Sequence, residues 1–336
     1  MKILFFTSKT NDYMEDCLLH GLREVLGEKL IDYPKKEIMY KQNLNSRLTL
    51  HGLGFTLTGL LENIDIDREN IFHKVKNNYF DYVIFPSIYR QYDLFKKINK
   101  WLTPSKTIFI DGSDKSRHLS EFTFYLKKII FGRSPKIFSD SLYFKRELTD
   151  RTYSRFPATS FFYKFLNIIL PVNRINIRPI SFGIPEEKIV KSLPKKEKKW
   201  PVHIVDEELI SSIPGSHISY AFDNEKDYYS DLQKSEYGIT TKRAGWDCMR
   251  HYEIAANGSI ICFKNFKLKP SSCAPFDLQD GLNCISYSSF VDLNEKIVSL
   301  SEKDYSELLK NSISWVKSKT TKNIALYLLE EIERNS

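Results

Sequence analysis

The sequence repeats one unit, a short run of apolar residues followed by a segment with helical spacing. Lys2–Phe6 is such a run, and the leucines and valine of residues 18–26 repeat at helical spacing until Gly27. Tyr82–Phe85 and Thr107–Ile110 are further runs of the same kind. Continuously apolar strands are typical of parallel sheets that are covered on both faces. The unit therefore predicts an α/β fold.

The chain is long enough for two such domains. It has 336 residues, and single cores rarely grow beyond roughly 250 residues. A stretch rich in proline and lysine, KSLPKKEKKWP, indicates a linker at 186–200. This divides the chain into domains 1–185 and 201–336, which predicts two Rossmann-like domains facing a cleft.

The expected second domain begins with two strands and ends with helices. Val202–Val205 and Ile218–Phe222 are the predicted strands. Apolar periodicity predicts helices over Leu293–Leu300, Lys303–Val316 and Thr321–Glu333. We expect the last of these to pack back across the first domain.

Charge and cysteine content narrow the class of protein. A net charge of +8 and a pI near 9.0 favour an anionic partner. The sequence lacks zinc-finger spacing and RNA-recognition signatures, so we expect no nucleic-acid partner. The 5 cysteines include no CxxC pair, which argues against a disulfide framework and a zinc site and favours a cytoplasmic protein. No run reaches 18 apolar residues, so a spanning helix is not expected.

The stretch Tyr237–Phe263 carries the densest set of charged and aromatic groups. Thr240 or Thr241 is a suitable N-cap for a helix over 242–256. Asn257-Gly258 is a typical stop signal, and the apolar run 260–263 predicts a buried strand directly after it.

One face of this predicted helix is too polar to be core. At 100° per residue, one arc holds Arg243, Trp246, Asp247, Arg250, Glu253 and Asn257. Guanidinium groups bind phosphates and a carboxylate accepts from vicinal hydroxyls, so the arc suits a ligand with both groups. The alternative is a solvated face with internal Arg–Glu pairing, and the stretch alone does not separate the two.

Acidic residues follow the run Thr107–Ile110. Asp111 and Asp114 would lie at the carboxyl end of a parallel strand, where open α/β sheets place their ligand crevice. Either one could instead cap a helix beginning near Ser116. The glycine-containing segment His51–Leu61 lacks GxGxxG spacing and is predicted as a loop near the interdomain cleft.

Between Phe122 and Pro171 aromatic and aliphatic residues are interleaved with lysine and arginine. Such a mixture can lie on an anionic bilayer surface, and core helices with loops are the alternative. Lys145 and Arg146 in this region could also approach an anionic substrate.

The segment RHYE, residues 250–253, followed by AANGSI, residues 255–260, resembles a donor-binding motif of GT-B glycosyltransferases, including exostosin-like and bacterial polysaccharide enzymes. Further matching pieces, among them YFKREL (143–148) and ISFGIP (180–185), extend the resemblance over most of the chain. One position departs from it, because many relatives carry proline where this chain has Ile261.

The resemblance implies roles for particular residues. Glu253 would bind hydroxyls of the donor, and Arg250 would neutralise the leaving phosphate, with Arg243, Lys242 and Asn257 as further donor-binding candidates. An inverting enzyme would also need an acceptor-side base, for which Asp111 is the first choice and Asp114 the second; a retaining enzyme would not. A nucleotide-sugar would be the substrate, and neither cofactor nor metal is expected.

The leading hypothesis is a cytoplasmic glycosyltransferase that builds a surface polysaccharide such as lipopolysaccharide. Its acceptor would be a glycan or a lipid-linked sugar at the inner membrane face. The first alternative is a non-catalytic protein of the same fold that binds a glycan or a partner. Another nucleotide-dependent enzyme, such as an epimerase, is a third, although no GxGxxG follows the first run.

Overall fold

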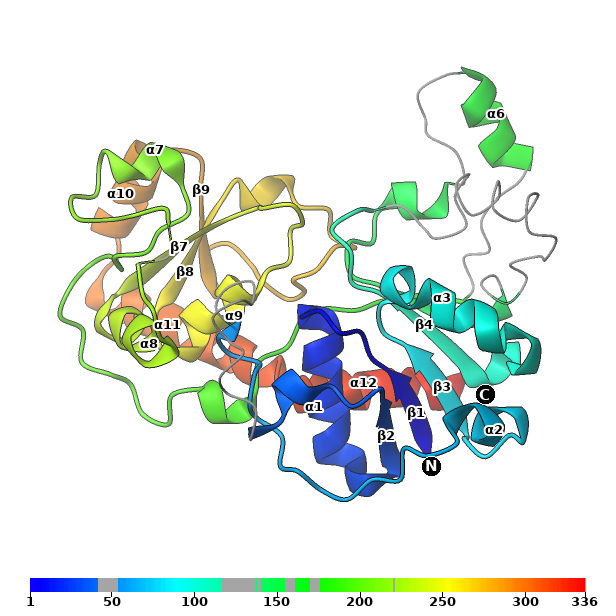
Figure 1. Cartoon of the computed structure of the whole chain (residues 1–336). Coiled ribbons are helices and arrows are strands. Elements are labelled where there is room, and N and C mark those ends of the chain that lie inside the picture. The colour runs from blue at the N-terminus through cyan, green and yellow to red at the C-terminus, as the bar shows by residue number, and fades with distance from the viewer. Residues whose placement is uncertain are drawn as a thin grey trace.

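The computed structural model describes residues 1–41, 54–116, 137, 140–154, 161–169, 176–219 and 221–335. Six parallel strands in the order β2-β1-β3-β4-β5-β6 form the sheet of the first half (Figure 1). These strands are β1 (Ile3–Phe6), β2 (Leu30–Tyr33), β3 (Tyr82–Phe85), β4 (Thr107–Asp111), β5 (Leu142–Lys145) and β6 (Ile177–Pro179). The apolar runs of the sequence therefore become buried central strands, as predicted.

Alternate side chains of this sheet face two separate layers. Ile3 and Phe5 belong to the core that includes α1 (Tyr13–Leu26) and α12 (Thr321–Arg334). Leu4 and Phe6 belong to the core on the opposite face, which contains residues of α2 (Ile71–Lys76) and α3 (Ile88–Ile98). Successive side chains of a strand point to opposite faces of the sheet, so a continuously apolar strand presents apolar groups to both layers.

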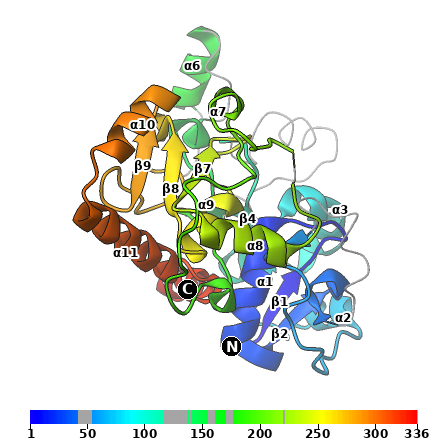
Figure 2. The same ribbon diagram turned by 90° about the vertical axis from the view of Figure 1, so that its left-hand side faces the viewer.

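A smaller parallel sheet organises the second half (Figure 2). Its order is β7-β8-β9, and its strands are β7 (Tyr237–Thr241), β8 (Ile260–Lys264) and β9 (Cys284–Tyr287). The helices of this half are α7 (Glu207–Ile210), α8 (Glu225–Lys234), α9 (Met249–Ala256), α10 (Phe290–Val298) and α11 (Glu302–Ser318). Buried residues of α9 and β8 join the same apolar core as α1 and α12, so the two halves share it.

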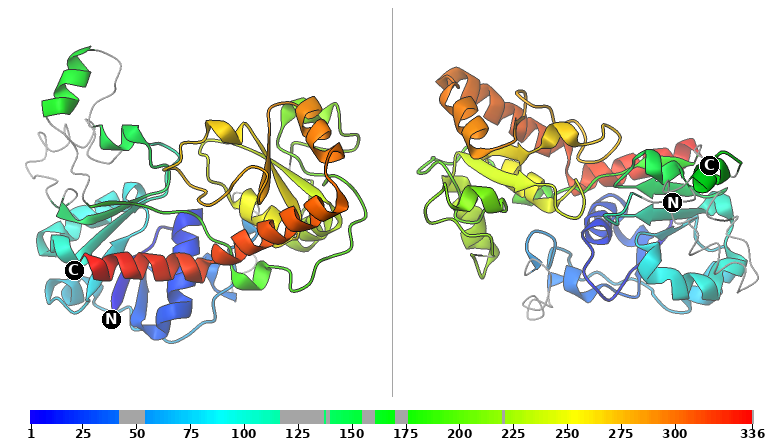
Figure 3. Two further views of the ribbon diagram at one scale, coloured as in Figure 1. Left: turned by 180° about the vertical axis from the view of Figure 1, so that it is seen from behind. Right: turned by 90° about the horizontal axis from the view of Figure 1, so that it is seen from above.

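The C-terminal helix α12 crosses back onto the first half, as the sequence predicted (Figure 3). It packs along α1 so closely that a Cβ on Gly21 would lie 2.0 Å from the Thr321 carbonyl oxygen. His20 Nδ1 also lies 2.8 Å from Thr321 Oγ1. Arg178 of β6 donates a hydrogen bond of 2.7 Å to the Glu331 carboxylate of α12. Absence of a side chain at Gly21 thus permits the crossing.

Local structure around residues 237–263 differs from the prediction. Thr240 and Thr241 belong to β7 and cap no helix, because β7 pairs in parallel with β8 up to Thr241. The helix begins at Met249 and its N-cap residue is Cys248. Residues 242–248 therefore form a connecting loop, so the predicted arc spans a loop and a helix and is not one helical face.

The two strands expected after the linker are also absent as strands. His203 and His217 form only an isolated bridge, since residues 202–222 otherwise run as loop and short helix in the part that the structure describes. The predicted domain boundary at 186–200 stays a prediction, although it lies between the two sheets. Much of the segment 122–171 falls outside the described residues.

Candidate functional site

A cavity of about 860 Å³ lies between the two halves. The first half contributes the loops after β1, β3 and β4, which include Asp12, Ser87 and Asp114. The second half contributes the loop after β7 and the start of α9. Each contributing loop of the first sheet follows the carboxyl end of a parallel strand, where open α/β sheets bind ligands.

Helix α9 presents Arg250 and Glu253 to this cavity. The residues are three positions apart, so both side chains lie on one face of the helix. Cys248 and Met249 at the helix N-terminus line the cavity as well. Backbone N–H groups and the positive end of the helix dipole favour an anion at this point. The structure thus brings the two residues of the RHYE motif to the cavity wall, while their chemical roles stay predictions.

Arg250 is oriented by a histidine that the sequence did not single out. Its Nη2 lies 3.3 Å from His203 Nε2, and His203 Nδ1 lies 3.0 Å from the Ser219 carbonyl oxygen. The carbonyl requires a proton on Nδ1, which leaves Nε2 as the acceptor for the guanidinium. Burial and the neighbouring Arg250 lower the pKa of His203 to about 4. The imidazole is therefore neutral at ordinary pH.

Glu253 is held by hydroxyl groups from both halves. It accepts a hydrogen bond from Thr56 of the first half and a 2.9 Å bond from the Tyr228 hydroxyl. Burial raises the pKa of the Glu253 carboxyl, and the Thr56 hydroxyl and the charge of Arg250 act against that rise. Thr56 belongs to the predicted cleft loop 51–61, whose described residues do approach the cleft; residues 51–53 lie outside the described part.

The other donor-side candidates occupy three different environments. Arg243 is exposed and lines the cavity. Lys242 is exposed outside the cavity lining, where its Nζ lies 3.4 Å from the Arg243 carbonyl oxygen. Asn257 is fully buried and bonds the Glu253 carbonyl oxygen at 2.9 Å. Its position supports the end of α9 and gives no access to a ligand.

Asp111 and Asp114 both line the cavity but differ in exposure. The Asp111 side chain is buried and accepts from the Tyr143 hydroxyl at 2.7 Å, while Lys145 Nζ lies 2.8 Å away. Half of the Asp114 side-chain surface is exposed, at 50%. Lys145 itself is completely buried, and it lies outside the cavity lining because its ammonium bonds to Asp111 and Ser113. Its expected approach to a substrate is not supported.

Arg146 lines the cavity and connects the two halves. Its guanidinium donates to the Gly112 and Asp247 carbonyl oxygens and forms an ion pair with Asp114. The Asp247 carboxylate in turn accepts from the Phe182 N–H at 2.9 Å. Arg146 is 1% exposed, so its charge is used within the protein. Arg146 also lines the cavity, so it supports the contact between the halves while its predicted phosphate-side role stays a prediction.

Three residues that contact Arg250 or Glu253 were given no role by the sequence. His203 was part of a predicted strand, and Thr56 was one polar residue in a loop assigned only by its glycines. Tyr228 lies on α8, in a segment that shares the glycosyltransferase resemblance but for which the resemblance implied no role. They come together because α8, α9 and loop 54–60 converge, which is a long-range contact that local patterns do not report.

Comparison with known proteins gives a fold but no close relative. No protein-family profile matches the chain, and no curated protein matches it in sequence. Among solved structures, HepE of Anabaena in complex with UDP-glucose aligns at a TM-score of 0.52 with 8% identity, over 99% of this chain and 100% of that one. A glycosyltransferase of Rickettsia africae aligns at 0.53 with 11% identity, over 100% and 99% of the two chains.

An α-glucosyltransferase in complex with UDP and a DNA 13-mer aligns at 0.52 with 10% identity, over 99% of both chains. The fold is that of the GT-B glycosyltransferases. A grouping with exostosin-like proteins finds no support among these matches. Because one protein of this fold is bound to DNA, the expected absence of a nucleic-acid partner is not supported either.

Two further observations concern metals and membranes. The described residues contain no group of three or more His, Cys, Asp or Glu side chains that could hold a metal ion. Among the described helices, none has the length and apolar character needed to cross a membrane.

Proposed function

We propose that this protein is a glycosyltransferase that transfers a sugar from a UDP-linked or related nucleotide-activated donor. The observation that carries the proposal is the position of Arg250 and Glu253 on one face of α9, at the wall of the interdomain cavity of a GT-B fold. HepE and the α-glucosyltransferase of the same fold are complexed with UDP-glucose or UDP. The shared fold supports a donor of that class.

In this proposal the second half holds the donor. Arg250 and Arg243 neutralise the diphosphate, whose negative charge grows as the bond to the sugar breaks. The N–H groups at the start of α9 add fixed dipoles. Glu253 accepts from ribose or sugar hydroxyls through lone pairs not used by Thr56 and Tyr228. No cofactor and no metal is required, because cations of the protein stabilise the leaving group.

The first half holds the acceptor. Between the two carboxylates proposed as its base, Asp114 is better placed than Asp111, because its side chain is half exposed and lines the cavity. Asp111 supports Lys145 and Tyr143 instead. This assignment applies to an inverting reaction, and a retaining reaction needs no such base.

The experiment that tests the proposal combines donor binding with transfer. Isothermal titration with UDP and with a panel of other nucleotides measures affinity in the wild type, Arg250→Ala and Glu253→Gln. A donor screen with mass detection identifies the transferred sugar. We expect both variants to stay folded and to lose transfer. Full transfer by both would remove the site assignment, and no response to any nucleotide would favour the non-catalytic alternative.

An exposed apolar helix is the basis for proposing a lipid-linked acceptor. The proposed setting is surface polysaccharide synthesis at the inner membrane face. Helix α6 (Phe161–Ile169) extends from the first half in Figure 1, and Phe161 is 88% exposed, Ile168 77% and Phe165 52%. Lys164 on the same helix is exposed, and the sequence from 151 to 185 holds no acidic residue. Apolar side chains beside cations suit an anionic bilayer surface. We therefore propose a cytoplasmic, peripheral location.

A further inference from the structure

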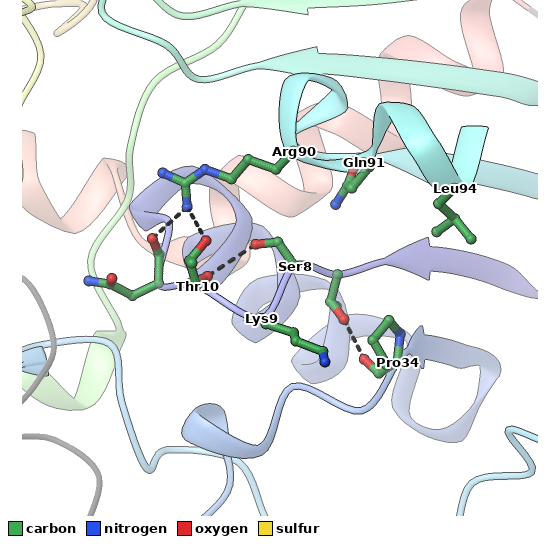
Figure 4. A pocket seen from close by; sticks show the side chains of 9 residues that line it. Ser8, Lys9, Thr10, Pro34, Arg90, Gln91 and Leu94 are labelled. Carbon is green, nitrogen blue, oxygen red and sulfur yellow. Dashed lines mark hydrogen bonds between the residues drawn. The ribbon is translucent and has the colours of Figure 1, made fainter. Parts of the chain in front are cut away.

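A second cavity, of about 740 Å³, lies in the first half alone (Figure 4). It is bounded by the loop after β1, by Pro34 after β2 and by α3. In the strand order β2-β1-β3, the chain leaves β1 toward β2 on one side and returns to β3 on the other. The cavity therefore lies at the point where the strand order reverses, which is the preferred ligand position in an open parallel sheet.

The charged residues of its lining are all cationic. The lining consists of Thr7, Ser8, Lys9, Thr10, Asn11, Pro34, Arg90, Gln91 and Leu94. Lys9 and Arg90 come from different elements, the loop after β1 and α3 (Figure 4). Lys9 is exposed, whereas Arg90 also forms an ion pair with Asp12. Two cations with hydroxyl groups between them suit an anionic, hydroxylated ligand.

Arg90 is fixed in position yet keeps donors available. Its Nη1 donates to Thr10 Oγ1 at 2.7 Å and to the Asn11 carbonyl oxygen at 2.8 Å. Its Nε lies 3.6 Å from Asp12 Oδ2, and no described residue accepts a hydrogen bond from Nη2. A guanidinium held in this way loses little side-chain entropy when it binds a phosphate or carboxylate.

A buried charge cluster holds the loop that carries Lys9. Lys36 Nζ lies 2.8 Å from Asp16 Oδ1 and donates to Glu15 and to the Thr10 carbonyl oxygen. Glu15 also accepts from the Ser8 N–H at 2.8 Å. Lys36 offsets one of these two carboxylate charges, and its contacts tie Thr10 and, through Glu15, Ser8 to α1. The loop that carries Lys9 is thereby held in place.

The two cavities meet at Asn11 and Arg90, which line both. A ligand in the smaller cavity would therefore extend toward the proposed donor site from the acceptor side. We propose that the cavity between β1 and α3 is an acceptor subsite that binds an anionic group, a phosphate or a carboxylate, through Lys9 and Arg90. That the bound group belongs to an acceptor rests on the proposed transfer function. Binding of an anion in this cavity can be tested without it.

The test is ligand binding by saturation-transfer NMR and titration with four probes. Glucose 6-phosphate and glucuronate carry the anion on a sugar, citronellyl phosphate carries it on a lipid chain, and glucose is the neutral comparison. We expect the anionic probes to bind and glucose to bind at least tenfold more weakly. The ratio of the affinities for glucose 6-phosphate and citronellyl phosphate then shows whether the cavity prefers a sugar phosphate or a lipid phosphate.

Variants assign this binding to the cavity. Lys9→Ala and Arg90→Ala should each weaken the anionic probes at least fivefold, whereas Lys9→Arg should keep most of the affinity. Lys97→Ala is the matched control, because Lys97 is an exposed lysine of α3 outside the lining. Circular dichroism of each variant checks folding.

Three results would overturn the subsite. The first two are equal affinities for glucose and glucose 6-phosphate, and equal effects of Lys9→Ala and Lys97→Ala on binding. The third is displacement of glucose 6-phosphate by UDP, which would place the sugar phosphate in the donor cavity. UDP titration of the wild type separates the two proposals. If UDP binds and no anionic sugar or lipid phosphate binds, the subsite alone fails; if UDP does not bind, the transfer function fails while anion binding is judged on its own data.

Discussion

Arg250 Nη2 and His203 Nε2 lie 3.3 Å apart, and this contact sets the direction of the guanidinium at the interdomain cavity. His203 is itself fixed by the Ser219 carbonyl oxygen at 3.0 Å. The resulting chain of contacts joins the segment 202–219, which includes α7, to α9. A histidine outside the RHYE motif thereby controls a residue inside it.

The first prediction follows from this contact. His203→Ala removes one contact of Arg250 and should weaken UDP binding by about tenfold, since a hydrogen bond to a charged group contributes roughly 1.5–3 kcal/mol. Isothermal titration measures the change. His217→Ala is the control, because His217 is exposed and lines neither cavity. Equal UDP affinity in wild type and His203→Ala would show that Arg250 is oriented by other contacts.

The second prediction concerns pH. The pKa of His203 is lowered from 6.5 to about 4, chiefly by burial. Between these values the unfolded chain binds a proton that the folded chain does not, so His203 makes the folded state less stable as pH falls from 6.5 toward 4. Above pH 6.5 both states are neutral and the effect vanishes.

Thermal unfolding of wild type and His203→Gln from pH 7.5 to 4.5 measures this contribution. The difference in Tm between the two proteins should change in favour of the variant as pH falls below 6.5. A constant difference over the whole range would mean that His203 is protonated alike in both states.

The fold could largely be predicted from the local pattern of apolar residues, whereas the candidate site could be predicted only in part. Continuous apolar runs predicted β1, β3, β4 and β8 because buried strands need no partner information to be seen. The start of α9 was misplaced because Thr240 and Thr241, good cap residues in isolation, are paired in β7 instead. Tertiary pairing overrode a local preference.

For the site, the position of Arg250 and Glu253 at the cavity could be predicted because both lie within one local motif, while their roles stay predictions. Lys145 was misjudged because its partner Asp111 lies on the neighbouring strand, in register with it across the sheet. Charge in a sequence does not tell whether the ammonium is exposed or neutralised by a group far away in the chain. The same reason hid His203 and Thr56, whose neighbours are distant in sequence.

A third prediction addresses the contact between Thr56 and Glu253. Thr56→Val keeps the volume but removes the hydroxyl that donates to Glu253 and lies 2.7 Å from the Tyr229 hydroxyl. We expect several-fold weaker binding of the UDP-sugar donor and a lower Tm, because the buried carboxylate loses one of its hydrogen bonds. Thr58→Val is the matched control, since the Thr58 hydroxyl bonds the Gly54 carbonyl oxygen in the same loop. Equal losses in both variants would point to a loop effect.

A fourth prediction concerns α6 and lipid. Replacement of Phe161 and Phe165 by Ser removes two exposed aromatic side chains and should reduce flotation with anionic liposomes severalfold, because less apolar area is buried in the bilayer. Val291→Ser and Val298→Ser, at exposed positions of α10, are the control. High salt should weaken the wild type further by screening Lys164 and its cationic neighbours. Absence of the wild type from the lipid fraction at both low and high salt would refute the membrane proposal.

The last prediction tests the crossing of α12 over α1. Gly21→Ala places a methyl group 2.0 Å from the Thr321 carbonyl oxygen and 3.0 Å from Ala325 Cβ, so the two helices must separate. Overpacking of this kind typically costs about 1–3 kcal/mol, which denaturant unfolding would detect as a lower midpoint. Lys322→Ala, at an exposed position of α12, should leave the midpoint unchanged. Since α12 belongs to the core shared by both halves, Gly21→Ala should also weaken UDP binding. An unchanged midpoint of denaturant unfolding would show that α1 and α12 are not packed this closely in solution.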